Sequence, residues 1–450
     1  MNLISGWGLH NPANVRIIKP NKFEQLENII VNSNKNSLLA RGLGRSYGDA
    51  AQLKNESVFS LHDFDHIYLN KKEGFITAGS GVSIDSLLKK IIPEGFFIPV
   101  SPGTRNVTIG GAIASDVHGK NHHLNGSFGN HIKEILLIDG LGNLKKLSSN
   151  NNETIEIKNQ FWATIGGMGL TGVIIEATFS LIPIKTSKMK ANTYKYKDLD
   201  DLMDAMTNSQ DNYQYIVAWV DSLSQKNRGV LTVGNHADDN DLLKKDPNKN
   251  ILSYHSKSIA SAPSILPFRL LNKFTVKAFN EVWYRKTPKE QKDEIKSISN
   301  FFHPLDGIKN WNKFYGSKGF IQYQFVVPEN EYKTIFEILE ITKKISTPSF
   351  LTVLKKFGPG NKAFLSFPIK GWTLAIDFPL YLSNLNQTLL KLDEKVLSAG
   401  GRIYLAKDSM QSSEMFKSTY PRLNEWKEVK SKMDPKNIFC SDLSKRLNIF

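Results

Sequence analysis

Cysteine is almost missing from this chain of 450 residues, since Cys440 is the only one. A single thiol cannot form an internal disulfide bond or build a metal site from several thiolates. The chain also lacks any run of about 18 apolar residues, so no transmembrane helix is expected. Its first residues, MNLISGWGLHNP, have neither a basic start nor a long apolar core, so we expect no signal peptide. The expected location is the cytoplasm or the periphery of the inner membrane.

Blocks of like charge are also missing, although the balance is basic. The 58 Lys and Arg residues exceed the 43 Asp and Glu residues, for a formal net charge of +15, and the lysines are scattered. Such a distribution is typical of a solvated surface. No zinc-finger or RRM-type signature accompanies it, so we expect no nucleic-acid partner. The length favours two domains.

A stretch with the spacing of a dinucleotide-binding fingerprint lies at Gly167-x-Gly169-x-x-Gly172. In a Rossmann unit a helix follows these glycines, and an acidic residue about 20 positions later binds the ribose. Here VIIEATFSL follows, whose β-branched and aromatic residues favour a strand, and a lysine-rich run comes where the acid would be. We therefore expect any flavin or nicotinamide to be held by another architecture.

The pattern of the chain predicts an α+β protein. Residues 15–20 and 37–42 read as strands; between them Asn21 is placed to cap a helix with Glu24 in the capping box. A second helix is expected from near Ser83, with Ile84, Leu87, Leu88 and Ile91 on one face. The middle, 184–401, alternates strands at 213–222, 319–328, 350–358 and 372–380 with amphipathic helices such as 331–344, which indicates an antiparallel sheet carrying helices.

A basic segment at 265–279 stands apart because it contains no acid. On a helix, Arg269, Lys273 and Lys277 would form one stripe with Leu270 and Phe274 beside it. Such a helix suits an anionic membrane surface. A helix packed on its own domain with its basic residues outward fits the same pattern, and both interpretations stay open.

Two glycine-rich loops are candidate cofactor sites. In ARGLGRSYGDAA (40–51), three glycines and two arginines can turn backbone N–H groups and charge toward a phosphate, although a tight turn also needs glycine. The loop at 101–131 holds four histidines and six glycines. Metal ligands need thiolate or carboxylate company, or a clear helical or hairpin spacing, and the adjacent His122 and His123 would point to opposite faces of a strand, so no metal site is expected. Small residues there suit a flat cofactor pressed against the backbone.

A third candidate is Lys407, which follows the alternating Ile403 and Leu405 in GGRIYLAKDSM. A buried lysine is costly unless it meets an anion or acts as a base. A solvated lysine at a strand edge is the other interpretation.

Taken together, ARGLGRSYGDAAQ, PGTRNVTIGGAIASDVHGKNHHLNGSFGNH, GFIQYQFVVP, KKFGPGN, LSFPIKGW and YLAKDS resemble a branch of the PCMH-type FAD-linked oxidases, which have the vanillyl-alcohol-oxidase fold. The branch is the one that acts on decaprenylphosphoryl-β-D-ribose. The resemblance implies an FAD-binding domain of two α+β subdomains (1–183), a substrate-binding cap domain with an antiparallel sheet and helices (184–401), and a C-terminal segment (402–450) that returns to the FAD domain.

The resemblance also implies a set of site residues. The catalytic residues would be Lys407 and His118. The cofactor-binding residues would be Ala40, Arg41, Gly42, Leu43, Gly44, Arg45, Ser46, Tyr47, Gly48, Asp49, Ala50, Gly103, Thr108, Ile109, Gly110, Gly111, Ser115, Asp116, Val117, His118, Val173 and Tyr404. The substrate-binding residues would be Gln322, Gln324, Lys355, Trp372 and Lys407. Arg45-Ser46 stand where many relatives have a histidine that tethers FAD, which implies noncovalent FAD.

The implied reaction oxidises the C2 hydroxyl of a polyprenyl-phospho-pentose to a ketone by hydride transfer to flavin N5. An NADH-dependent keto-reductase partner would complete a 2'-epimerisation. An alternative is an FAD-dependent oxidase of soluble alditols or aldonolactones, which share the fold. Ala375 stands where mycobacterial members carry a cysteine, and Thr373 where asparagine is usual, so the fit around the sugar can differ from theirs.

Overall fold

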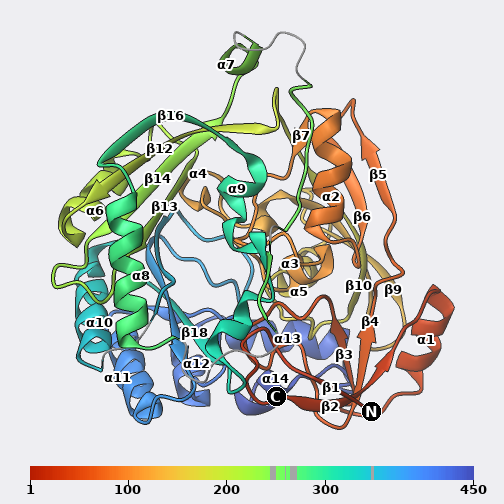
Figure 1. Ribbon diagram of the computed structural model, residues 1–450. Helices are drawn as coiled ribbons and strands as arrows, with labels where there is room; N and C mark the ends of the chain where they lie inside the picture. The colour runs from red at the N-terminus through yellow and green to blue at the C-terminus, as the bar shows by residue number, and fades with distance from the viewer. Residues whose placement is uncertain (244–249, 259, 264–270, 346–348) are drawn as a thin grey trace.

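The computed structural model describes residues 1–243, 250–258, 260–263, 271–345 and 349–450. Figure 1 shows two halves side by side: strands from the N-terminal third on the right, and a large sheet from the middle of the chain on the left. Helices α6, α10 and α11 lie along the outer side of the large sheet. The candidate active site lies where the inner face of that sheet meets loops of the N-terminal third.

The N-terminal third contributes two sheets. The four-stranded sheet has the order β1 (Asn2–Ile4), β2 (Ala13–Ile18), β4 (Ser57–Ser60), β3 (Leu38–Arg41), and β4 pairs in parallel with both β2 and β3. The antiparallel five-stranded sheet has the order β5 (Ile67–Asn70), β6 (Phe75–Gly79), β10 (Val173–Ser180), β8 (Ile132–Ile138), β9 (Leu144–Ser148). Helices α1 (Phe23–Val31), α2 (Ile84–Ile91), α3 (Ile109–Ala114) and α5 (Ile155–Thr164) belong to the same third.

Helix α2 follows the predicted pattern. Ser83 caps it by accepting a hydrogen bond from the N–H of Ser86, and its four predicted apolar residues are fully buried. Helix α1 differs at its start, because Lys22 is the N-cap residue and has no side-chain cap. Asn21 instead donates its backbone N–H to the Gln25 side chain. The predicted Asn21 capping box is therefore wrong by one residue.

The glycines with fingerprint spacing lie between α5 and β10, so a helix precedes them and a strand follows. This is the reverse of a Rossmann unit. Gly169 has a φ of 76°, and Gly172 brings its Cα so close to β8 that a Cβ would meet the Ile138 carbonyl oxygen at 2.4 Å. The glycines serve a tight turn, as the β-rich residues after them indicated.

The middle of the chain forms an eight-stranded sheet with neighbouring strands antiparallel. Its order is β16 (Glu290–Ser297), β12 (Lys188–Tyr196), β14 (Gly229–His236), β13 (Tyr215–Val220), β19 (Thr352–Phe357), β20 (Gly371–Pro379), β18 (Phe320–Pro328), β21 (Arg402–Ile403). Its outer face packs on α6 (Leu199–Asn208), α10 (Lys333–Lys344) and α11 (Leu385–Ser398) in one apolar core. Strand β21 lies just beyond the expected domain boundary at 401, so the sheet reaches into the C-terminal segment.

After β21 the chain returns to the N-terminal third. The C-terminal helices are α12 (Ser413–Thr419), α13 (Leu423–Met433) and α14 (Asp442–Arg446). The backbone N–H of Cys440 donates to the carbonyl of Leu38 in β3 at 3.0 Å, and Trp426 donates its indole N–H to the carbonyl of Ala163. The ends of the chain thus support the same lobe.

The basic segment only partly matches its prediction. Helix α8 (Lys273–Lys286) begins at Lys273 and is capped by Asn272, whose side chain accepts from the N–H groups of Phe274 and Thr275. Lys273 and Lys277 are exposed on it, whereas Arg269 and Leu270 lie outside the described residues. Among the described residues, no helix has the length and apolar character needed to cross a bilayer.

Candidate active site

The loop after β3 presents a row of main-chain donors. None of the four backbone N–H groups of residues 43–46 donates a hydrogen bond within the described part of the chain. Gly44 has a φ of 63°, the left-handed conformation that lets successive N–H groups turn to one side. Unpaired N–H groups in such a loop are suited to an anion such as a pyrophosphate.

Two glycines of this loop allow close contact with other candidate segments. A Cβ on Gly42 would lie 2.3 Å from the Thr108 hydroxyl, and one on Gly48 would lie 1.9 Å from the Asp408 carbonyl oxygen. The backbone N–H of Tyr47 donates to the carbonyl of Ala406 at 2.9 Å. The loop is therefore packed directly against the segment that carries Lys407.

The charged side chains of the loop at residues 40–51 contact other groups of the protein. Arg41 donates to the carbonyls of Ala51 and Ser5, and Asp49 forms an ion pair with Arg446 at 2.8 Å. Arg45 lies over the ring of Trp7, 4.1 Å from its centroid. Arg41 and Asp49 thus shape the loop, and the main chain supplies its open donors.

The second candidate loop is held by internal hydrogen bonds. Thr108 caps α3, Ile109 and Gly110 donate their N–H groups to the carbonyls of Val82 and Ser80, and Gly111 donates to the Thr108 hydroxyl. Asp116 is fully buried and accepts hydrogen bonds from four groups: Ser127, Gly129, Asn361 and Ser366. These candidates fix the shape of the loop. Around Gly103, in contrast, a Cβ would meet nothing within 4 Å.

His118 lies at the junction of the two lobes. Its Nε2 accepts from the Gln324 side-chain amide at 3.0 Å, which leaves the proton on Nδ1, and Nδ1 has no partner within the described residues. Burial, followed by the charge of Lys355, lowers the pKa of His118 well below its usual value. A neutral His118 therefore offers one N–H donor to a bound molecule. Tyr404, 5.1 Å away between ring centroids, donates its hydroxyl proton to the Ser115 carbonyl.

The other candidate histidines do not gather at one point. His122 lies 4.4 Å from the Phe357 ring, His123 hydrogen-bonds the Tyr213 carbonyl, and His131 hydrogen-bonds the Asn125 carbonyl. Burial lowers the pKa of His122 to about 3. Within the described residues, no three His, Cys, Asp or Glu side chains are arranged to hold a metal ion.

The inner face of the large sheet supplies the opposite wall. Because side chains alternate along a strand, β18, β20 and β19 send every second residue toward the N-terminal loops. The register sets Gln322 opposite Asp377, Gln324 opposite Ala375, and Lys355 opposite Thr373. Gln324 also donates to the Thr373 hydroxyl at 3.2 Å. Three neighbouring strands thus form one polar surface.

Asp377 is the acid of this surface, and it is not among the site residues predicted from the sequence. Its carboxylate accepts from the Gln322 amide and from the Tyr315 hydroxyl, each at 2.7 Å. Burial raises its pKa to about 7, although both hydrogen bonds and the charge of Lys407 act against the rise. The alternation in WTLAIDFPL, with Thr373, Ala375 and Asp377 on one face, was the signal that could have found it.

Lys407 lies in the turn after β21, with its ammonium 3.6 Å from the centroid of the Tyr47 ring. Burial lowers its pKa to about 7, whereas the charge of Asp377 raises it and that of Lys355 lowers it further. A lysine with this pKa exchanges a proton near neutral pH. Lys407 is therefore not the solvated edge lysine that the sequence also allowed.

Two adjacent lysines on β19 have different environments. Lys356 forms an ion pair with Glu329 at 2.7 Å. Lys355 points to the other face, and no acceptor for its ammonium is found among the described residues. Burial lowers the pKa of Lys355 to about 8. An unpaired cation on this surface favours an anionic ligand.

The prediction that Trp372 binds the substrate is wrong. It lies next to Thr373 on β20 and therefore faces the outer side, where it is buried in the core with Leu374 and Ile376. It cannot wall the site. Aromatic residues that do lie on the inner face include Phe357 of β19, 4.9 Å from the His118 ring between centroids, and Trp219 of β13, which pairs with Val353 and donates its indole N–H to the Phe350 carbonyl.

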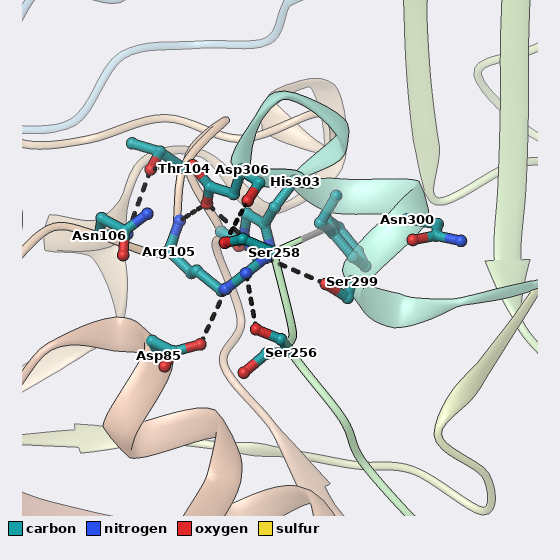
Figure 2. A network of polar contacts seen from close by, with 12 residues as sticks. Asp85, Thr104, Arg105, Asn106, Ser256, Ser258, Ser299, Asn300, His303 and Asp306 are labelled. Carbon is teal, nitrogen blue, oxygen red and sulfur yellow. Dashed lines mark hydrogen bonds and ion pairs between the residues drawn. The ribbon is translucent and has the colours of Figure 1, made fainter. Parts of the chain in front are cut away.

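A buried network ties the loop at Gly103 to the middle of the chain (Figure 2). The Arg105 guanidinium binds Asp85 of α2 at 2.8 Å and donates to Ser299 and to the Ser256 carbonyl. The Arg105 N–H donates to Asp306, which also accepts from Thr104. The network holds the loop against α9 (Ile298–Phe302) and the turn at Pro304–Gly307. Sequence spacing could not reveal it, because its members come from four distant segments.

Comparison with known proteins agrees with this geometry. Residues 15–148 match the FAD binding domain family, and residues 320–447 match the D-arabinono-1,4-lactone oxidase family. The chain is 37% identical to decaprenylphosphoryl-beta-D-ribose oxidase of Mycolicibacterium smegmatis, over 99% of this chain and 97% of that protein. It is 29% identical to an uncharacterized protein of Streptomyces coelicolor, over 82% and 100% of the two chains. Identity to L-gulonolactone oxidase 3 of Arabidopsis thaliana is 22%, over 82% and 69%.

The fold and both family matches define an FAD-dependent oxidoreductase with a PCMH-type FAD domain and a substrate domain. Within that class, the chain belongs to the family of the mycobacterial decaprenylphosphoryl-β-D-ribose oxidase.

The residues present fit FAD. The open N–H groups of residues 43–46 suit its pyrophosphate, and the buried, unpartnered Nδ1 of His118 lies at the junction with the substrate sheet. Gly42 and Gly48 keep the surrounding loops in direct contact. No histidine stands in the 40–50 loop, and noncovalent binding of FAD stays a prediction.

Proposed function

We propose that this protein oxidises the C2 hydroxyl of a pentose that is linked through phosphate to a polyprenyl lipid. The observation that carries the proposal is that Lys407, seated over the Tyr47 ring of the candidate cofactor loop, interacts electrostatically with Asp377 of the facing sheet, and burial brings the pKa of each to about 7. The activity for which the 37% identical relative of Mycolicibacterium smegmatis is named supports the substrate class. The same proposal includes a keto-reductase partner that returns the hydroxyl with inverted configuration.

The redox chemistry comes from FAD, which when bound accepts a hydride from the carbon that bears the hydroxyl. The protein supplies position and proton transfer. Neutral Lys407 accepts the hydroxyl proton, and the ionised Asp377 stabilises the ammonium that results. Gln322 and Tyr315 hold the carboxylate in place through their hydrogen bonds. His118 orients the sugar through its free Nδ1–H, and Gln324, whose two amide N–H groups bind His118 and Thr373, offers its carbonyl oxygen as an acceptor.

The substrate's phosphate is assigned to Lys355. It is a cation of the inner face whose ammonium has neither a hydrogen-bond acceptor nor an ion-pair partner among the described residues, and its neighbours His118 and His122 are neutral at pH 7. A charged hydrogen bond of this kind suits phosphate. A soluble aldonolactone carries no charge to meet Lys355, which favours the phospho-sugar over the alternative that the lactone-oxidase match of residues 320–447 supports.

The test is an anaerobic titration of the FAD-loaded protein with polyprenyl-phosphoribose while the flavin absorbance near 450 nm is followed. Bleaching by the phospholipid sugar, with none by free alditols or aldonolactones, is expected. Bleaching by the soluble sugars alone would overturn the proposal in favour of the alternative. Acid precipitation should release the yellow colour into the supernatant, because the FAD is held noncovalently.

A further inference from the structure

We propose that the outward face of helix α8 docks the protein on an anionic lipid bilayer. The inference extends the proposed function, since a polyprenyl-phosphate substrate resides in a membrane. It stands on the surface of α8 (Figure 1, green), where bulky apolar side chains and cations are exposed together.

Four large apolar residues of this 14-residue helix are exposed to solvent. Phe274 is 82% exposed, Val282 64%, Phe279 48% and Trp283 48%. Phe274 and Val282 lie on the helix side opposite the buried Val276 and Asn280, as the period of 3.6 residues requires. Phe279 lies on one flank of the helix, where its ring stacks on Trp283. An exposed cluster of this kind marks an interaction surface.

The charges around the cluster are mostly positive. Lys273, Lys277, Arg285 and Lys286 are exposed on α8. The acid of the helix, Glu281, is bound by Arg228 at 2.6 Å and by Arg285. A helix with an apolar face and flanking cations is suited to the interface of an anionic bilayer.

The opposite side of α8 is firmly fixed. Asn280 is buried and donates to Asp221 at 2.7 Å, and Tyr284 donates its hydroxyl proton to the Tyr196 carbonyl at the end of β12. The apolar face is therefore presented by a helix already folded, and docking needs no ordering of α8.

The helix adjoins the candidate active site. Leu271, just before its cap, accepts a hydrogen bond from Tyr381 and packs with the cluster of Tyr47, Trp311 and Tyr315. Tyr315 in turn donates to Asp377. A bilayer on α8 would thus lie beside the region where the sugar is oxidised.

An anionic bilayer suits this face better than a second copy of the chain. Two copies that met through α8 would bring together the same four cations, in a protein of net charge +15. Anionic headgroups would neutralise those cations while acyl chains covered Phe274 and Val282.

The test is sedimentation of the full-length FAD-loaded protein with vesicles of phosphatidylcholine and phosphatidylglycerol (7:3), in the absence of any sugar substrate. We expect binding that weakens with salt and is at least tenfold weaker on pure phosphatidylcholine. The double variant Phe274→Ser, Val282→Ser should bind at least tenfold more weakly, and Lys277→Gln about fivefold, as about 1 kcal/mol per basic residue implies. Leu390→Ser on α11, which removes another exposed apolar residue (59% exposed), should change nothing.

Equal binding of wild type and double variant, or equal binding to both vesicle types, would overturn the proposal. A wild-type dimer in analytical ultracentrifugation that the double variant abolishes would assign the face to a second copy instead. Because the vesicles contain no substrate, these outcomes are independent of whether the sugar proposed above is the correct one.

Discussion

The two walls of the candidate site bind by different chemical means. The N-terminal wall offers main-chain N–H groups of residues 43–46, and the charged side chains of its loop are bound elsewhere in the protein. The sheet wall offers side chains from alternate positions of β18, β19 and β20, including Lys355 and Asp377. Main-chain groups do not depend on which side chains the loop carries, so they suit a cofactor, whereas a particular substrate needs particular side chains. Substitutions should therefore separate cofactor binding from substrate chemistry.

Substitution of Lys407 is expected to give the largest difference between the effect on flavin reduction and the effect on FAD binding. Lys407→Met removes the proton acceptor and keeps a long side chain over Tyr47, so flavin reduction should slow about 10²–10⁴-fold while FAD stays bound. Stopped-flow absorbance and the flavin-to-protein ratio measure the two effects. Normal reduction by this variant would remove Lys407 from the mechanism.

The two lysines of β19 provide a matched pair. Lys355→Met should raise the KM for the phosphorylated substrate about 10–100-fold, since a hydrogen bond to a charged group is worth about 1.5–3 kcal/mol. Lys356→Met, which alters contacts on the outer face with Glu329, Thr207 and Trp372, should leave KM within about twofold. Equal effects of both changes would show that Lys355 does not meet the phosphate.

On the backbone side, Gly48→Ala forces a Cβ onto the Asp408 carbonyl. Relief of such overpacking costs about 1–3 kcal/mol, so FAD should bind roughly 10–100-fold more weakly, as measured by fluorescence of released flavin. Gly307→Ala is the control, because its Cβ would meet nothing within 4 Å. Unchanged FAD affinity in Gly48→Ala would argue against the close packing of the two segments.

The smallest effect is a shift in pH dependence. Neutral Lys407 is the reactive form, so the rate of flavin reduction should rise with pH through about 7, the pKa that burial gives this lysine. Asp377 raises the pKa of Lys407, and Asp377→Asn should therefore lower that pKa and move the rising limb to lower pH. A limb that stays in place or moves to higher pH would contradict the coupling.

Prediction from sequence succeeded where the signal was local. Ser83 and the apolar face of α2 are adjacent in the chain, and the strand after Gly172 was indicated by its own β-branched residues. Asn21 failed because a capping box fixes a helix start only to within a residue or so when neighbouring side chains compete.

The site was predictable in its loops and less so on its sheet. Trp372 and Trp219 both lie on strands, and only the register decides which faces the site. The alternation in WTLAIDFPL contained that information for Asp377, whereas the partners of Arg105 are scattered from Asp85 to Asp306 and leave no pattern in the chain. The contacts that the sequence did not predict are therefore those between residues far apart in the chain.

The contact of Lys407 with Tyr47 has a consequence for how the enzyme comes into being. Tyr47, whose ring contacts the Lys407 ammonium, is synthesised near the start of the chain, whereas Lys407 is synthesised near its end. A nascent polypeptide could shape its nucleotide loop early, yet it would acquire reactivity only once its last tenth had emerged from the ribosome and folded back. Catalytic turnover therefore requires a chain that has been synthesised and folded to its C-terminal end.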